Sequence, residues 1–291
     1  MADQAVIIGF WANAGLMVVK LLAGYFGKSE AVFADGLESA CDFVVMLSAI
    51  IALRIGRKPF DHEHPYGHGK AESIAALLVS LVIFSTGGGI LYKSIITIID
   101  RNFERPQLIA VIAALATIVI KELLFRYTKN IADKIESPAV GAIAQDHRKD
   151  ALTSIATLIG VSGAYFGAVF MDPLAAGITA FFIFHIGLET FRSASYDLMD
   201  GQQPEDLIEI VTAFAGGVEG VEHVHGIRAR RSGQYVIVDL KLEMDANITV
   251  KHSHDIAAEV KRLIFERFPN VGDVMIHINP HEEEHEDMVR L

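Results

Sequence analysis

Four carboxylates inside two apolar stretches are the residues best suited to chemistry. Glu38 and Asp42 lie four residues apart in one stretch, and Asp146 and Asp150 repeat that spacing in another. Residues four apart share one face of a helix, so each helix would present an acidic pair. A carboxylate at the centre of a bilayer costs about 2.5–3.5 kcal/mol, a cost that a cation bound between the pairs would offset. The spacing therefore predicts one cation site shared by two membrane helices.

An alternative interpretation places these acids at helix ends, in lipid headgroups or water. It has most force for Asp146 and Asp150, because the run Asp-His-Arg-Lys-Asp is strongly polar. The same acidic spacing in two separate stretches favours the cation site. Asp35 is a further acid in the first stretch.

A second cluster is the segment Asp61-His62-Glu63-His64-Pro65-Tyr66-Gly67-His68-Gly69-Lys70, which holds three histidines and two acids. Imidazole and carboxylate both ligate zinc-like ions. Pro65 and Gly67 keep the segment bent, so that its side chains could converge on a metal. A polar loop whose histidines face solvent is the alternative. Lys70 could pair with an acid such as Asp200, which would give the segment a structural or regulatory role.

The C-terminal part of the chain carries a third, dispersed group: His223, His225, Asp239, His252, His254 and His277. A metal could tie strands or subunits together there, although scattered histidines are equally typical of a plain surface. The run His281-Glu282-Glu283-Glu284-His285 satisfies the pattern H-E-x-x-H. It follows Pro280 in an acidic tail, so we interpret it as a solvated run rather than a catalytic zinc site.

The elements that must position these groups are long and apolar. The chain has 291 residues, of which 52% are hydrophobic, and two stretches of bilayer-spanning length, Ser73 to Tyr92 and Ala151 to Met171, contain no charge. Such stretches recur through two-thirds of the chain, which excludes a signal peptide as their explanation. Six spans are predicted: Ala5–Phe26, Glu30–Ile55, Glu72–Ile99, Pro106–Tyr127, Pro138–Phe170 and Pro173–Phe191.

The charges between the spans predict the orientation of the chain. The connection after the second span carries Arg54, Arg57, Lys58 and Lys70, and the one after the fourth carries Arg126, Lys129 and Lys134. The connection after the first span has only Lys28, and the one after the fifth has no Lys or Arg. The third connection departs from this pattern, since it carries Lys93, Arg101 and Arg105. Because positive loops stay in the cytosol, both termini are predicted to be cytosolic.

The character of the chain changes near residue 200. Pro204, Glu205 and Asp206 open a predicted helix that ends at Gly216. Strands are predicted over His225–Arg230 and Tyr235–Glu243, a helix over Asp255–Phe268 and a strand over Val274–Ile278. This αββαβ order suits a small open sheet with helices on one face. We therefore expect a six-helix membrane domain over residues 1–200, a cytosolic α+β domain over 201–280 and an acidic, mobile tail over 281–291.

Composition narrows the possible functions. The net charge of −11 argues against nucleic acid as a partner, because no basic stripe offsets it. Cys41 is the single cysteine, which excludes a disulfide framework and any multi-thiolate zinc site within one chain. The sequence contains no G-x-x-x-x-G-K-[ST] loop, so we expect neither a nucleotide motor nor an organic cofactor.

At this point the chain resembles the cation diffusion facilitator family over nearly its whole length. The strongest likeness is His64-Pro-Tyr-Gly-His68-Gly-Lys-Ala-Glu72, which is similar to the family's signature after its second helix. Glu38 with Asp42, and Asp146 with Asp150, fall on the family's two membrane metal pairs. The resemblance implies a homodimeric divalent metal/proton antiporter of a bacterial inner membrane, with a metallochaperone-like cytosolic domain.

The resemblance also implies metal at two further places. Asp61, His64 and His68 would form a loop site. His225, His254 and His277 fall on positions that are ligands in some bacterial zinc members, while Lys241 and Asn279 replace a histidine and an aspartate there. Because a lysine opposes a bound cation, we do not expect the family's two-metal site, and a remodelled site that uses Asp239 is the alternative. Divalent metal would thus be both substrate and regulator.

The ligand types suggest which metal is carried. The four membrane carboxylates form an all-oxygen, hard ligand set with room for water, which suits Mn²⁺ first and Fe²⁺ next. Zn²⁺ stays possible, since oxygen ligands generally bind it more tightly than Mn²⁺, and a helix rotation that turned His147 inward would favour it.

The predicted mechanism needs no ATP. Four carboxylates in a dry pocket cannot all stay ionised without metal, so protons and metal would displace each other. A metal sensor or scaffold with vestigial transport is the main alternative function. A membrane-embedded metalloenzyme is a more distant one, because no positioned nucleophile accompanies the histidines, and the chain is not expected to be an enzyme.

Overall fold

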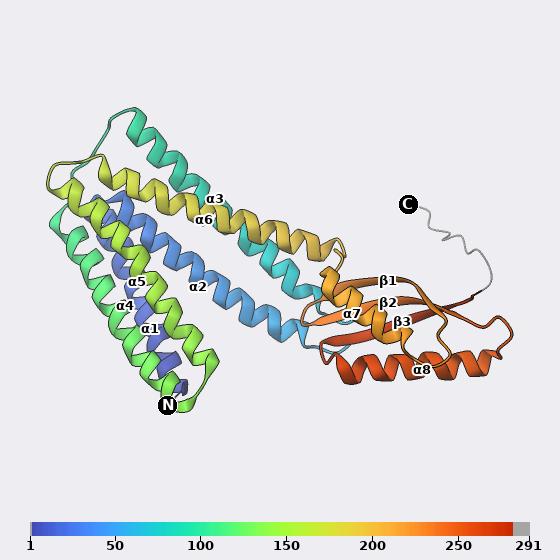
Figure 1. Cartoon of the computed structure of the whole chain (residues 1–291). Coiled ribbons are helices and arrows are strands. Elements are labelled where there is room, and N and C mark those ends of the chain that lie inside the picture. The colour runs from blue at the N-terminus through green and yellow to red at the C-terminus, as the bar shows by residue number, and fades with distance from the viewer. Residues whose placement is uncertain (1, 282–291) are drawn as a thin grey trace. The chain divides into compact units, whose positions relative to one another are not determined.

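The computed structural model describes residues 2–281, which form six long helices followed by a small α/β part (Figure 1). The predicted tail from residue 282 onward lies outside the described residues. The long helices are α1 (Ala2–Phe26), α2 (Glu30–Gly56), α3 (Lys70–Ile99), α4 (Leu108–Ile135), α5 (Pro138–Tyr165) and α6 (Met171–Leu198). The C-terminal elements are α7 (Glu205–Gly216), β1 (His223–Ser232), β2 (Tyr235–Met244), α8 (Val250–Arg267) and β3 (Val271–Pro280). The predicted helical membrane region and αββαβ order are confirmed.

Five of the long helices are long and apolar enough to cross a membrane, namely α1, α2, α3, α4 and α6. Among the described helices, α5 has the length but not the hydropathy of the other five. Its polar character comes from the segment between Asp146 and Asp150, which also contains Arg148 and Lys149. The helix that carries half of the predicted cation site is therefore the least apolar of the six.

Three predicted boundaries are wrong in instructive ways. Helix α4 runs to Ile135 rather than Tyr127, because the ion pair Lys129–Asp133 supports a polar extension until Glu136 adopts a left-handed conformation. Helix α5 ends at Tyr165, close to Gly167 with its φ of 120°. Helix α8 begins at Val250 rather than Asp255, because the Thr249 side chain accepts a hydrogen bond from the His252 amide.

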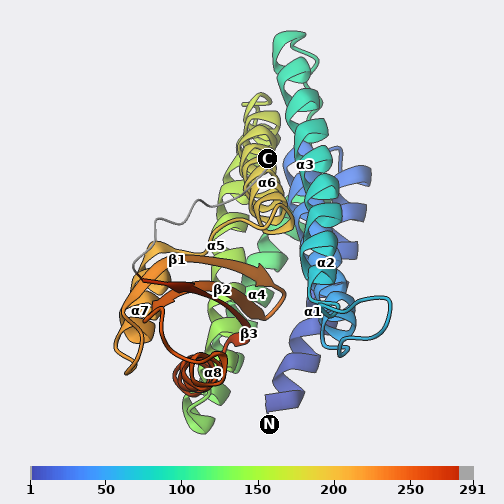
Figure 2. The same ribbon diagram turned by 90° about the vertical axis from the view of Figure 1, so that its right-hand side faces the viewer.

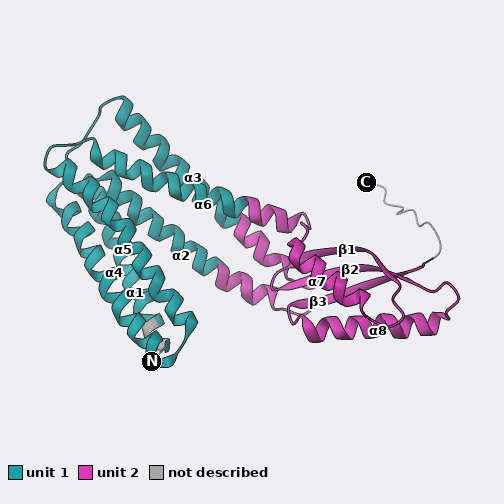
Figure 3. Cartoon of the chain, in the orientation of Figure 1, with its two compact units in different colours: residues 1–48, 78–191 teal, residues 49–77, 192–291 magenta. Residues whose placement is uncertain are grey.

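The chain divides into two compact units, residues 1–48 with 78–191 and residues 49–77 with 192–291 (Figure 3). The first unit contains most of the helical region. One link across it joins α6 to the start of α2, where the Asp172 carboxylate accepts hydrogen bonds from the Ser29 hydroxyl (2.5 Å) and the Glu30 amide (2.6 Å). An acid at a helix N-terminus satisfies free amide groups and complements the helix dipole.

In the second unit, β1 pairs antiparallel with β2, and β2 pairs parallel with β3, to give the order β1-β2-β3. Helices α7 and α8 lie on one side of this sheet (Figures 1 and 2). Val211 of α7 and Ile256 and Val260 of α8 pack in one core with Val238 and Leu240 of β2. The alternation of side chains along a strand leaves the opposite face of the sheet to polar residues.

Helices α3 and α6 approach each other through two reciprocal glycine contacts. A Cβ placed on Gly87 of α3 would lie 2.5 Å from the backbone nitrogen of Phe184 in α6. A Cβ placed on Gly187 of α6 would lie 2.7 Å from the backbone nitrogen of Phe84 in α3. The two phenylalanine rings pack between the glycines with centroids 4.4 Å apart. Small residues of this kind let helix backbones pack closely inside a membrane.

We predict that Gly87→Val or Gly187→Val destabilises the helical unit by about 1–3 kcal/mol, because the new side chain overpacks a closed contact. The measurement is the midpoint of thermal aggregation of the detergent-solubilised protein. Gly89→Val is the matched control, since a Cβ at Gly89 meets no atom within 4 Å and the intrinsic helix penalty is the same. Equal midpoints for all three variants would contradict the close crossing.

Candidate metal centres

The predicted membrane site lies between α2 and α5. Asp42 is within electrostatic range of Asp146 and Asp150, and Glu38 is within range of Asp42 and Asp150. Glu38 and Asp150 are half-buried, whereas Asp42 and Asp146 are exposed in the isolated chain. The structure therefore brings the four carboxylates into one neighbourhood of negative charge. Within the described residues they do not form a closed group, with all ligand atoms within 4.8 Å of one another.

One of these four carboxylates forms an ion pair with a buried lysine that was not among the predicted site residues. The Lys121 Nζ atom of α4 lies 2.5 Å from Asp150 Oδ2 and donates a second hydrogen bond to Asn13 Oδ1 of α1 at 2.9 Å. Lys121 is only 3% exposed. The signal was present in the sequence, because a charge inside an apolar span is costly and functional by default.

A second buried lysine removes Asp35 from the candidate metal ligands. Lys20 of α1 lies 2.9 Å from Asp35 Oδ1 and also donates to the Ser39 hydroxyl at 2.7 Å. The other oxygen, Asp35 Oδ2, accepts a hydrogen bond from the Ser154 hydroxyl at 3.2 Å. This network ties α1, α2 and α5 together and leaves Asp35 no oxygen without a partner.

His147, which would favour Zn²⁺ if it joined the site, is buried. It is 2% exposed, and neither ring nitrogen has a hydrogen-bond partner among the described residues. Its imidazole lies against Gly9 of α1, where an added Cβ would come within 3.0 Å of Nε2. His147 thus packs against α1 and also lies within electrostatic range of Asp146 and Asp150.

The loop residues Asp61, His64 and His68 converge closely. Their ligand atoms all lie within 4.8 Å of one another, the one such group found among residues 2–281. The Asp61 carboxylate lies 3.4 Å from His64 Nδ1 and 3.5 Å from His68 Nε2, and the two imidazole rings are tilted by 39° with centroids 4.4 Å apart. A hydrogen bond from the His64 backbone amide lowers the pKa of Asp61, which keeps it ionised and able to ligate. One oxygen and two nitrogen donors fit a first-row divalent ion.

This loop is anchored to the C-terminal part of the same unit. Lys70 Nζ lies 2.7 Å from Asp200 Oδ1, as predicted, and 2.5 Å from the backbone oxygen of Asp197. Arg230 of β1 lies 3.6 Å from Asp200 Oδ2, and its guanidinium carbon lies over the Tyr66 ring, 5.9 Å from the centroid. The loop that could hold a metal is therefore coupled to the sheet through charged contacts.

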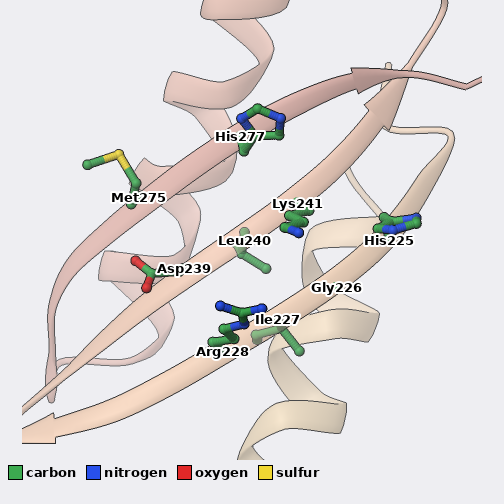
Figure 4. A pocket seen from close by; sticks show the side chains of 9 residues that line it. All are labelled: His225, Gly226, Ile227, Arg228, Asp239, Leu240, Lys241, Met275 and His277. Carbon is green, nitrogen blue, oxygen red and sulfur yellow. The ribbon is translucent and has the colours of Figure 1, made fainter. Parts of the chain in front are cut away.

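The polar face of the sheet forms a pocket that holds several of the predicted C-terminal ligands (Figure 4). Side chains of His225, Asp239 and His277 line it from three adjacent strands, together with Arg228 and Lys241. Asp239 pairs in register with Arg228, and Lys241 with His277. Two cationic side chains therefore share the pocket with the one acid, which opposes a metal bound by this chain alone.

His254 is not in this pocket. It lies on α8, and its side chain is exposed. His225 and His277 are thus brought together with Asp239, whereas His254 is not. His223 and His252 are also exposed and line no part of the pocket.

Glu243 was missed by the sequence analysis, although two histidines contact it. His225 Nδ1 lies 2.9 Å from Glu243 Oε1, and His281 Nδ1 lies 2.8 Å from Glu243 Oε2. These bonds, first from His281 and then from His225, hold the pKa of the Glu243 carboxyl below its usual range. His281 is exposed, as predicted for a solvated run, and the rest of that run lies outside the described residues. The alternation of buried and exposed residues along β2 did not identify Glu243. This residue lies at the end of the strand, where consecutive residues are buried.

Comparison with known proteins identifies the family. Residues 6–199 match the cation efflux transmembrane domain, and residues 203–281 match the cytoplasmic domain of cation efflux proteins. The chain belongs to the cation efflux family. It is 37% identical over 291 residues to the manganese efflux system protein MneP of Bacillus subtilis, covering 98% of each chain.

Two other cation efflux relatives align over nearly the whole chain. The manganese efflux system protein MneS of Bacillus subtilis is 33% identical and covers 97% of this chain and 96% of its own. The magnetosome protein MamB of Magnetospirillum gryphiswaldense is 29% identical, with 96% and 94% covered. Cation efflux proteins are membrane transporters, so the family match supports divalent-metal efflux as the broad function.

We predict that Asp61→Asn weakens metal binding at the loop, because it removes the one anionic donor while its amide oxygen can still accept the hydrogen bonds of the loop turn. Calorimetric titration of the full-length protein with Zn²⁺ as a probe should show one binding phase weakened or lost. Glu63→Gln is the matched control, since Glu63 lies in the same loop outside the converging group. An unchanged isotherm for Asp61→Asn would exclude the loop as a metal site.

Proposed function

We propose that this chain exports a divalent transition-metal ion, with Mn²⁺ preferred, Fe²⁺ next and Zn²⁺ possible, in exchange for protons. The observation that carries the proposal is the shared neighbourhood of Glu38, Asp42, Asp146 and Asp150 between two long helices. The three carboxylates other than Asp150 form no ion pair within residues 2–281. Without a bound cation, such a cluster of charges raises the free energy of the folded protein, and a cation that binds to it lowers that free energy.

Proton exchange follows from the electrostatics of the metal-free site. Carboxylates that share a desolvated pocket repel one another, so they cannot all carry charge when no metal is bound. They titrate as a group, and a divalent ion that binds them must displace protons. Protons that enter from the opposite side then release the metal, so the proton gradient drives export.

The preference for Mn²⁺ follows from ligand hardness. Carboxylate and water ligands suit Mn²⁺, whereas imidazole favours later first-row ions. Because oxygen ligands still bind Zn²⁺ more tightly, selection for Mn²⁺ must come from six-coordinate geometry. The imidazole of His147 packs against Gly9 of α1 but lies within electrostatic range of Asp146 and Asp150, so an all-oxygen site requires the imidazole to keep this position. MneP and MneS, the manganese efflux relatives, point in the same direction.

The rest of the chain would serve this transport. We propose a membrane domain over residues 1–200 and a cytosolic domain over 201–280, with both termini cytosolic, in a homodimer in a bacterial cytoplasmic membrane. Metal at Asp61, His64 and His68 would then act as a regulator or brace at the cytosolic surface. A site at His225, Asp239 and His277 would need further ligands to outweigh Lys241 and Arg228.

We predict that Asp42→Asn or Asp150→Asn reduces Mn²⁺ flux into proteoliposomes to the level of empty liposomes, because each removes one arm of the site. Flux is measured with a trapped metal-sensitive dye, and folding is checked by size-exclusion chromatography. Asp100→Asn is the control, since Asp100 is exposed at the end of α3. Wild-type flux in either variant would place the transport site elsewhere. Metal binding without flux in the unmodified protein would favour a sensor.

A second prediction concerns selectivity. Asp146→His should shift preference from Mn²⁺ towards Zn²⁺, because it places an imidazole in the otherwise all-oxygen set. The measurement is a competition flux assay with both ions at equal free concentration. Gln145→His adds a histidine at the neighbouring position, off the face shared by Asp146 and Asp150, and should leave the preference unchanged. If the unmodified protein already moves Zn²⁺ best, the ligand-hardness argument fails.

A further inference from the structure

Lys121 lies at the middle of α4, on the stripe of that helix that faces its neighbours. Thr117, Leu124 and Thr128 share the stripe and are buried with it. A lysine near the middle of a membrane helix is costly, so it persists only where a partner or a function compensates it. Here the partners are Asp150 of α5 and Asn13 of α1.

The pair is asymmetric in its exposure. The Lys121 side chain is 4% exposed, whereas the Asp150 side chain is 36% exposed. The buried Lys121 ammonium contacts Asp150 Oδ2, and the partly exposed Asp150 carboxylate also lies within electrostatic range of Asp42. An incoming metal ion would therefore meet a carboxylate that already has a cation behind it.

We propose that Lys121 is a tethered cation that occupies Asp150 when the site holds no metal and competes with the metal for that carboxylate. This inference rests on the proposed function, since it assigns Asp150 to the transport site. When metal binds, like charge pushes the ammonium from Asp150 towards Asn13, whose amide oxygen already accepts one of its hydrogen bonds.

The competition would shape transport in two ways. It weakens metal binding, because the metal must displace the Lys121 ammonium from Asp150 before it can bind that carboxylate. It also speeds release, because the ammonium returns to Asp150 as the metal leaves and the carboxylate is never left without a cation. The second buried pair, Lys20 with Asp35, has no such role, since both oxygens of Asp35 are already engaged by Lys20 and Ser154.

The test measures Mn²⁺ binding to the full-length protein by the paramagnetic resonance signal of free Mn²⁺, together with flux. The isotherm of Asp42→Asn, which keeps the loop and the C-terminal domain, is subtracted as background. Lys121→Gln should tighten Mn²⁺ binding by about tenfold or more, as expected when a close charged competitor is removed. It should also slow the maximal flux. Lys129→Gln, an exposed lysine of the same helix, should change neither quantity.

A double-mutant cycle separates competition from a merely structural role. In an Asp150→Asn background, Lys121→Gln should tighten the residual Mn²⁺ binding less than it does in the unmodified protein, because the contested carboxylate is gone and only the effect of Lys121 on Asp42 is left. If Lys121→Gln is lost at expression, Lys121→Arg decides the question. A guanidinium pairs with a carboxylate through two bonds, so this variant should bind Mn²⁺ more weakly than the unmodified protein.

Unchanged or weaker binding in folded Lys121→Gln, or unchanged binding in Lys121→Arg, overturns the tethered-cation proposal while leaving metal transport intact. Failure of the proposed function gives a different result: the unmodified protein then shows neither background-corrected Mn²⁺ binding nor flux.

Discussion

The structure of the helical unit depends on how negative charge is compensated among apolar helices. Asp35 and Asp150 each take a buried lysine, from α1 and α4 respectively, and these two pairs connect four helices. Glu38, Asp42 and Asp146 have no such partner within the described residues, which leaves a deficit of positive charge in one place. Two acids of the helical unit thus have a buried lysine as partner, and three acids in one neighbourhood do not. A divalent cation is the simplest species that completes the set.

In the second unit, acidic side chains are also paired with basic ones, but these pairs are accessible to water. Asp61 organises a compact turn and draws two imidazoles towards itself, while Lys70, Asp200 and Arg230 connect that turn to the sheet. Each of these exposed pairs contributes little alone, and a metal at Asp61 would add a bond that salt and water screen less. Metal occupancy of the loop would thereby stiffen its connection to the sheet. The pocket on the sheet differs, because Arg228 and Lys241 place positive charge where a ligand set would need to be acidic.

Much of this arrangement could be predicted from the sequence. The lengths of the apolar stretches predicted the long helices, and the i, i+4 spacing of the acids predicted the acidic pairs. Both are local properties of the chain. The partners of buried charges could not be predicted in the same way. Lys121 meets Asp150 and Asn13 only after three helices pack, and Glu243 meets His225 and His281 only after the sheet forms. The helix ends were misplaced where exposed ion pairs or a side-chain cap, as at Thr249, extended a helix beyond its apolar part.

The central claim is that one acidic cluster binds either metal or protons and so couples their movements. The most direct measurement records Mn²⁺ entry and lumenal pH together in sealed proteoliposomes that contain no other ion pathway. The account predicts that inward Mn²⁺ flux expels protons and raises the lumenal pH, and that an imposed pH gradient, acidic inside, accelerates Mn²⁺ entry. Mn²⁺ entry without any change in lumenal pH, and with no response to the gradient, would contradict it.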